Sequence, residues 1–83
     1  MNKTATLQLF SFFREKVGAD QLAVPIEPQE TIEDLYFWLM KQYPQAQFPL
    51  KNLRFAVNGE YVSKEHLVLA GDEVALIPPV AGG

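Results

Sequence analysis

The stretch TIEDLYFWLMKQY, residues 31–43, carries the strongest helical pattern in this 83-residue chain. Its apolar residues recur at the spacing of one buried helix face, namely Ile32, Leu35, Tyr36, Leu39, Met40 and Tyr43. Thr31 is a suitable N-cap, and two acidic residues follow in the first turn, where the helix dipole favours them. Pro44 disfavours helical geometry at the residue before it, which predicts where the helix ends. Phe37 and Trp38 lie off the stripe, and we expect them to pack under the loop that follows.

Two strand patterns precede this helix. Apolar and polar residues alternate over residues 5–12, and residues 21–26 alternate again. Residues 14–18 read as a turn or a short helical stub. Because the connection between the two patterns is short, we predict that they form an antiparallel pair.

Three shorter strand patterns follow the helix, after a predicted loop over residues 45–52. They cover residues 53–57, 60–62 and 73–77. Asn58-Gly59 separates the first two and is a strong hairpin signal, because both positions tolerate positive φ. Residues 70–72 form a second predicted turn. The last strand is expected to end before Pro78, which has no backbone N–H for a ladder.

The predicted order is therefore strand, strand, helix, strand, short strand, strand. One mixed sheet with one helix across a single face is the simplest way to bury both apolar sets, and it places the chain in the α+β class. This is the order of the β-grasp, or ubiquitin-like, fold. We predict a single domain over residues 1–77 and an extended, flexible tail over residues 78–83.

Composition excludes several kinds of site. The chain has no cysteine, which removes disulfides, thiolate metal sites and cysteine nucleophiles. His66 is the lone histidine, so no metal site is expected and a surface or loop position is favoured. The net charge of −3 gives no attraction to nucleic acid or anionic membranes; it suits either a basic partner or general solubility. No apolar run of membrane length appears, so the expected location is the cytoplasm.

Some apolar residues fall on the wrong face of the predicted sheet. The helix is expected to cover the face that carries Leu7, Leu9, Val74 and Leu76. Phe10 and Ile77 then lie on the opposite face, and Tyr61 follows the nearby hairpin turn. Large apolar groups gathered on a polar face suggest a docking surface for a partner. The pattern alone fits equally well a loop that covers them, or residues that stand singly.

The segment after the last strand pattern forms a distinctive tail. It reads Pro78, Pro79, Val80, Ala81, Gly82 and Gly83. The two prolines favour a stiff, extended spacer, and the glycines permit close backbone approach inside a narrow channel. A carboxylate on Gly83 would be sterically open to activation as an acyl-adenylate and to attack by a nucleophile. A frayed end is the alternative reading.

Three stretches resemble one known family. They are AGDEVALIPPVAGG at residues 70–83, LFSFFREKVG at residues 9–18 and AVNGEYV at residues 56–62. Together they resemble the molybdopterin synthase small subunit, the MoaD type of sulfur carrier. Ala81 stands where that family commonly has Ser or Thr, which is a conservative difference.

The resemblance implies a mechanism. An E1-like adenylyltransferase activates Gly83 with ATP, and a sulfurtransferase or desulfurase converts it to a thiocarboxylate. The tail enters the large synthase subunit, and its sulfur attacks cyclic pyranopterin monophosphate on the way to the molybdenum cofactor. The family pattern assigns Gly82 to passage through the pocket, Pro78 to Ala81 to the spacer, and Phe10, Tyr61 and Ile77 to partner contact. It also implies that this chain binds no cofactor and is a sulfur-donating co-substrate in a heterotetramer.

Three other functions remain open at this point. A thiamine-thiazole sulfur carrier shares the fold and the Gly-Gly end, although the Pro-Pro-Val element disfavours it. A ubiquitin-like protein modifier would have the same terminal chemistry but a different product. A plain interaction module would not need Gly82 and Gly83 at all.

Overall fold

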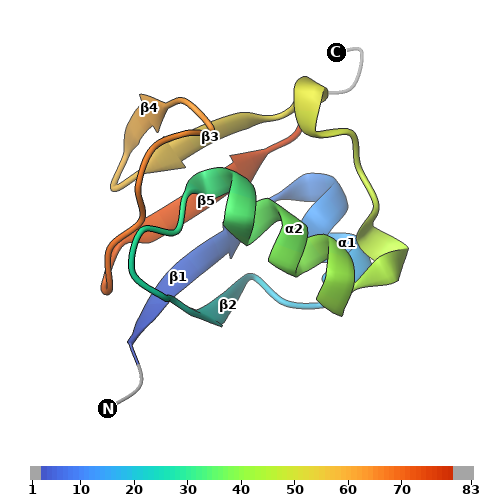
Figure 1. Cartoon of the computed structure of the whole chain (residues 1–83). Coiled ribbons are helices and arrows are strands. Elements are labelled where there is room, and N and C mark those ends of the chain that lie inside the picture. The colour runs from blue at the N-terminus through green and yellow to red at the C-terminus, as the bar shows by residue number, and fades with distance from the viewer. Residues whose placement is uncertain (1–2, 80–83) are drawn as a thin grey trace.

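The computed structural model describes residues 3–79, which form a five-stranded mixed sheet with a helix across one face (Figure 1). The strands are β1 (Thr4–Leu9), β2 (Gln21–Pro25), β3 (Arg54–Val57), β4 (Glu60–Val62) and β5 (Glu73–Ile77). The helices are α1 (Ser11–Val17) and α2 (Ile32–Gln42), with 3-10 turns η1 (Pro44–Ala46) and η2 (Leu50–Asn52). The order in the sheet is β2-β1-β5-β3-β4. The predicted α+β, β-grasp class is confirmed.

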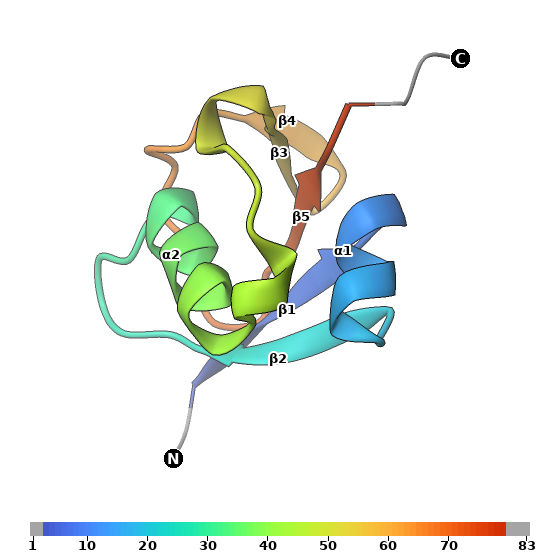
Figure 2. The same cartoon turned by 90° about the vertical axis from the view of Figure 1, so that its right-hand side faces the viewer.

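The last strand in sequence is the central strand of the sheet. β1 and β5 are parallel, with Leu9 opposite Leu76, whereas β3 runs antiparallel to β5, with Arg54 opposite Ile77. The end of β1, the start of β3 and the end of β5 therefore lie at the same end of the sheet. The chain leaves the domain at this end of the sheet (Figure 2).

The core lies between the sheet and α2. The predicted stripe is buried at five positions, Ile32, Leu35, Tyr36, Leu39 and Met40, and Tyr43 packs against them in part. The predicted sheet face, Leu7, Leu9, Val74 and Leu76, is at most 2% exposed. Each such side chain contributes about 1.5–3 kcal/mol relative to an exposed one. The face assignment made from strand phase is confirmed.

The start of α2 is fixed by a capping box. The Thr31 hydroxyl accepts a hydrogen bond from the Asp34 backbone N–H at 3.3 Å, and the Asp34 carboxylate accepts one from the Thr31 N–H at 2.8 Å. Two N–H groups that the helix cannot satisfy internally are thereby paired. The helix ends at Gln42 with Tyr43 as its C-cap, immediately before Pro44 as predicted.

The prediction that the first strand continues to Phe12 is wrong. β1 ends at Leu9, and Ser11 takes a φ of 46°, which turns the chain into α1. The helix buries Phe13 completely and packs Phe12 against the core, where both rings contact Phe48. Burial of these aromatic rings favours the helix over a continued strand, although apolar and polar residues still alternate past Leu9. The predicted antiparallel pairing of residues 5–12 with residues 21–26 is nevertheless confirmed for β1 and β2.

The connection after α2 is more ordered than a plain loop. It contains η1 and η2, and the Tyr36 hydroxyl donates a hydrogen bond to the Phe48 carbonyl. Trp38 is partly buried and packs against the core. Phe37 does not, because its side chain points away from the sheet and is 55% exposed. The expectation that the following segment covers Phe37 is therefore wrong.

Candidate functional site

An apolar patch lies on the face of the sheet that α2 leaves uncovered. Phe10 is 43% exposed, Tyr61 is 71% exposed and Ile77 is half-buried. These three side chains line one hollow of about 320 Å³. The structure thus brings together Phe10 and Ile77, which strand phase placed on the opposite face, and Tyr61, which was expected near them after the hairpin turn. We call this group, Phe10, Tyr61 and Ile77, the apolar patch.

Small side chains form the floor of this hollow. Ala56 and Ala75 are direct partners in the β3–β5 ladder, and both line the hollow. A larger residue at either position would fill the space between the three patch side chains. At the far rim, the Gln8 side-chain amide donates to the Glu73 carboxylate at 3.2 Å. The sequence analysis missed the two alanines, although their phase, opposite to that of the core residues, could have revealed them.

The topology explains why the patch forms. Because β1 and β5 are parallel and Leu9 pairs with Leu76, the residues that follow them lie side by side: Phe10 just after β1, and Ile77 at the end of β5. The turn at Ser11 keeps Phe10 at this edge instead of letting the strand run on. Tyr61 comes from β4, where it pairs with Ala56 on the far side of the same hollow.

The root of the tail is anchored in the domain. Pro78 is buried, whereas Pro79 is exposed. Both prolines line a second hollow of about 260 Å³ together with Asn52, Arg54, Tyr61 and Ile77. The exit direction of the chain is therefore set by packing at Pro78. The predicted tail residues Val80, Ala81, Gly82 and Gly83 lie outside the described residues.

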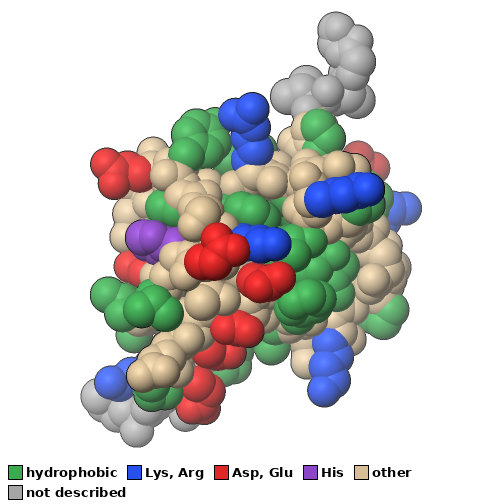
Figure 3. Space-filling view, turned by 45° about the horizontal axis from the view of Figure 1, so that its top comes forward, with side chains coloured by type: hydrophobic (Ala, Val, Ile, Leu, Met, Phe, Trp, Pro, Cys, Tyr) green, Lys and Arg blue, Asp and Glu red, His purple; other side chains and the backbone are tan. Residues whose placement is uncertain are grey.

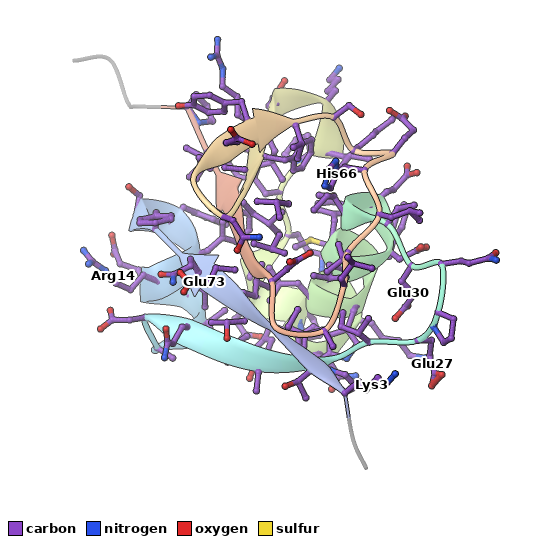
Figure 4. The ribbon with its side chains drawn as sticks, turned by 90° about the vertical axis from the view of Figure 1, so that its left-hand side faces the viewer. Lys3, Arg14, Glu27, Glu30, His66 and Glu73 are labelled. Atoms are coloured by element: carbon purple, nitrogen blue, oxygen red, sulfur yellow. The ribbon has the colours of Figure 1, made fainter. Side chains whose placement is uncertain are left out.

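The remaining candidate groups in the described part of the chain are its acidic residues and His66. Within residues 3–79, no three or more His, Asp and Glu side chains lie close enough to hold a metal ion. His66 is exposed in the segment after β4, as predicted, and lies on the other side of the molecule from Glu73 and Arg14 in Figure 4. No helix among these residues is long and apolar enough to cross a membrane. The arrangement can bind a partner and present a segment to it.

This sheet order, the helix across one face and the patch beside the end of β5 define a ubiquitin-like β-grasp protein. A model of the ThiS family matches residues 7–83. The chain therefore belongs to the ThiS family, in its MoaD-type branch of molybdopterin synthase sulfur carriers.

Relatives of known name support this assignment. The molybdopterin synthase sulfur carrier subunit of Dictyostelium discoideum is 33% identical over the full length of both chains. That of Escherichia coli K12 is 38% identical over 89% of this chain and 93% of the relative. Among solved structures, small archaeal modifier protein 1 from Haloferax volcanii superposes with a TM-score of 0.83 at 27% identity, covering 96% of this chain and 99% of that one.

Proposed function

We propose that this chain is the sulfur carrier subunit of a molybdopterin synthase and that Gly83 carries the sulfur as a thiocarboxylate. The observation that carries the proposal is the position of the apolar patch. Phe10, Tyr61 and Ile77 surround the end of β5, from which the chain continues directly into Pro78 and the predicted tail. A partner that binds the patch would receive the tail at a fixed place. The family match extends through residue 83, which supports a common role for the tail.

Loading would take two steps on a partner enzyme. A carboxylate oxygen of Gly83 attacks the α-phosphate of ATP, which forms an acyl-adenylate and releases pyrophosphate. Sulfide, or the terminal sulfur of a persulfide on a desulfurase or sulfurtransferase, then attacks the acyl carbon and displaces AMP. Sulfide gives the thiocarboxylate directly. A persulfide gives an acyl disulfide, from which a second thiol would release the thiocarboxylate by forming a disulfide with the donor's sulfur. The E1-like adenylyltransferase would supply the ATP site, and this chain would supply the acyl group.

Delivery would take place on the large synthase subunit. There the thiocarboxylate sulfur would bond to a carbon of cyclic pyranopterin monophosphate, whose oxygen substituent leaves as water. A second water molecule would then cleave the bond between this sulfur and Gly83, which leaves the sulfur on the pterin and returns the tail to a carboxylate for another cycle. Two such transfers would supply the two sulfurs of molybdopterin. The catalytic pocket would belong to the large subunit, so this chain acts as a co-substrate that is consumed and regenerated.

The chain itself would contribute positioning. Pro78 anchors the tail in the domain, and Pro79, Val80 and Ala81 would span the distance into the partner's pocket. Gly82 would allow the backbone through the narrowest part, because it has no side chain. The patch would bury its three large side chains against the large subunit in a heterotetramer, which we place in the cytoplasm with its ATP-dependent partner.

Molybdopterin formation tests this proposal. The loaded chain is mixed with the large subunit and cyclic pyranopterin monophosphate, and the product is quantified in a single turnover. We expect product from the wild type and none from a chain that lacks Gly83. A loaded chain that binds the large subunit yet yields no molybdopterin would contradict the assignment.

The likeness to the small archaeal modifier protein favours a second candidate function, conjugation to protein lysines. The terminal activation would be the same, but an amine would displace AMP in place of sulfur. Mass spectrometry of cell proteins would then find Gly83 joined to lysine side chains. A thiazole carrier would instead be loaded with sulfur but would give no product with the synthase subunit.

A further inference from the structure

Tyr61 also borders a basic surface that lies outside the apolar patch. Tyr61 lines three hollows, one of which lies between β3 and the segment after β4 and has a volume of about 370 Å³. Arg54 and Lys64 both line this hollow, and Arg54 also lines the one at the root of the tail. The linings of these two hollows contain no carboxylate.

This distribution runs against the overall charge of the chain, which is −3. Arg54 lies opposite Ile77, at the end of the sheet where the tail leaves. Lys64 follows the last residue of β4 at the same end. On the same sheet face, Glu73 begins β5 at the other end; Glu60 begins β4 at that end too, but opposite the core residue Val57.

Two acidic residues do lie near Lys64, since Glu65 follows it in sequence and the Glu33 backbone N–H donates a hydrogen bond to the Lys64 carbonyl at 3.0 Å. Others lie at the far end of the molecule. Glu27 and Glu30 point outward at the end of the molecule remote from the tail (Figure 4). On the face in Figure 3, most Asp and Glu side chains lie in the lower left half, whereas several Lys and Arg side chains lie in the upper and right half. The tail therefore leaves from the more basic end of an acidic protein.

We propose that Arg54 and Lys64, which line one hollow together with the exposed Tyr61, bind an acidic segment of the protein that accepts the tail. The proposal rests on the proposed function, since it assumes that a partner receives the tail at this edge. A guanidinium can hold a carboxylate with two parallel hydrogen bonds, and the Tyr61 hydroxyl is a further donor beside it. The acidic far end would repel the same segment, so the charge pattern also fixes the orientation of docking.

A short acidic peptide segment fits this surface better than a nucleic acid. Stable binding to a polyanion draws on many phosphate contacts, and two cations beside a net negative domain cannot supply them. Exposed ion pairs add little to affinity, and their main effect is on the rate of encounter. The site should therefore govern how fast the partner binds.

Association kinetics with the large synthase subunit test the site. We expect Arg54→Glu to lower the association rate about tenfold at low salt, with little change in the dissociation rate. The difference should shrink as salt is raised, because screening removes it. Lys41→Glu is the matched control: it changes the net charge equally but lies in the last turn of α2, in the other layer, and should leave the rate unchanged.

The outcomes separate this site from the proposed function. If the wild type binds the large subunit and Arg54→Glu binds at the same rate, or faster, the acidic-segment site is wrong and the carrier function stands. If the wild type does not bind the large subunit at all, both fail. Retention of a single-stranded oligonucleotide by the wild type, lost in Arg54→Glu, would make this a phosphate-binding surface and would also overturn the proposal.

Discussion

Arg54 and Ile77 lie directly opposite each other in the β3–β5 ladder, at the edge where the chain leaves the sheet. Ile77 belongs to the apolar patch, and Arg54 begins the basic surface on the outer side of Tyr61. One ladder position therefore joins an apolar contact to a charged one. Because both residues lie beside Pro78, a partner that contacts them would lie next to the start of the tail.

Removal of a patch side chain should weaken binding to the large subunit. Phe10→Ala and Ile77→Ala each remove an apolar anchor, and we expect a loss of about 1 kcal/mol or more, which is fivefold or more in Kd. Phe37→Ala is the control, since Phe37 is a similarly exposed aromatic in the opposite layer. Isothermal titration calorimetry measures the three values. Equal affinity for Phe10→Ala, Ile77→Ala and the wild type would refute the patch as a docking surface.

Relief of backbone strain at Ser11 should stabilise the domain. A non-glycine residue at φ 46° is strained by about 1–2 kcal/mol, while glycine loses about 0.5–1 kcal/mol through its more flexible unfolded state. The net expectation for Ser11→Gly is a gain of about 0.5–1 kcal/mol in the free energy of unfolding by urea denaturation. Ser63→Gly, at an exposed serine without positive φ, should instead be slightly destabilising. A loss of stability at both positions would argue against strain at Ser11.

The capping box should behave as one unit. Thr31→Ala is expected to lower the free energy of unfolding by about 1 kcal/mol, because the Asp34 N–H loses its acceptor. Asp34→Ala removes the reciprocal bond. The double variant should cost less than the sum of the single ones, because the hydrogen bond from the Thr31 hydroxyl to the Asp34 carboxylate is lost in either single variant. Strictly additive losses would mean that the two bonds act independently.

Pro78 and Pro79 should differ although they are neighbours of the same type. Pro78→Ala removes buried ring carbons and should lower the free energy of unfolding by about 1–2 kcal/mol. Pro79→Ala changes an exposed ring and should stay within about 0.5 kcal/mol of the wild type. The effect of proline on the unfolded chain is common to both, so the comparison isolates packing. Equal losses in denaturation would contradict an anchored tail root.

The elements predicted best are those determined by local sequence. The 3.6-residue stripe and Thr31 predicted α2, and Asn58-Gly59 predicted the β3–β4 turn, where the observed φ values are 51° and 87°. The prediction failed around Phe12, because the local sequence fits both an alternating strand and a helix with one buried face. Only packing against Phe48, a distant residue, decides between the two.

The candidate site was predictable in part. Strand phase selected Phe10 and Ile77, but their proximity depends on the parallel pairing of β1 with β5, which joins distant parts of the chain. The proposed role of Arg54 could not be predicted. A charged residue at the start of a strand is common at any exposed position, and its place beside the tail follows only from the pairing of β3 with β5. The anchoring of Pro78 likewise depends on burial, which a Pro-Pro pair does not reveal.

The central claim is that Gly83 carries sulfur, and the intact mass of the chain tests it most directly. The chain is incubated with its activating enzyme, ATP and a sulfur donor, with the Escherichia coli carrier and its own enzyme as the positive control. We expect a mass increase equal to the replacement of one oxygen by sulfur, located at Gly83 by fragmentation and absent without ATP. An unaltered Gly83, under conditions in which the control carrier is loaded, would contradict the claim.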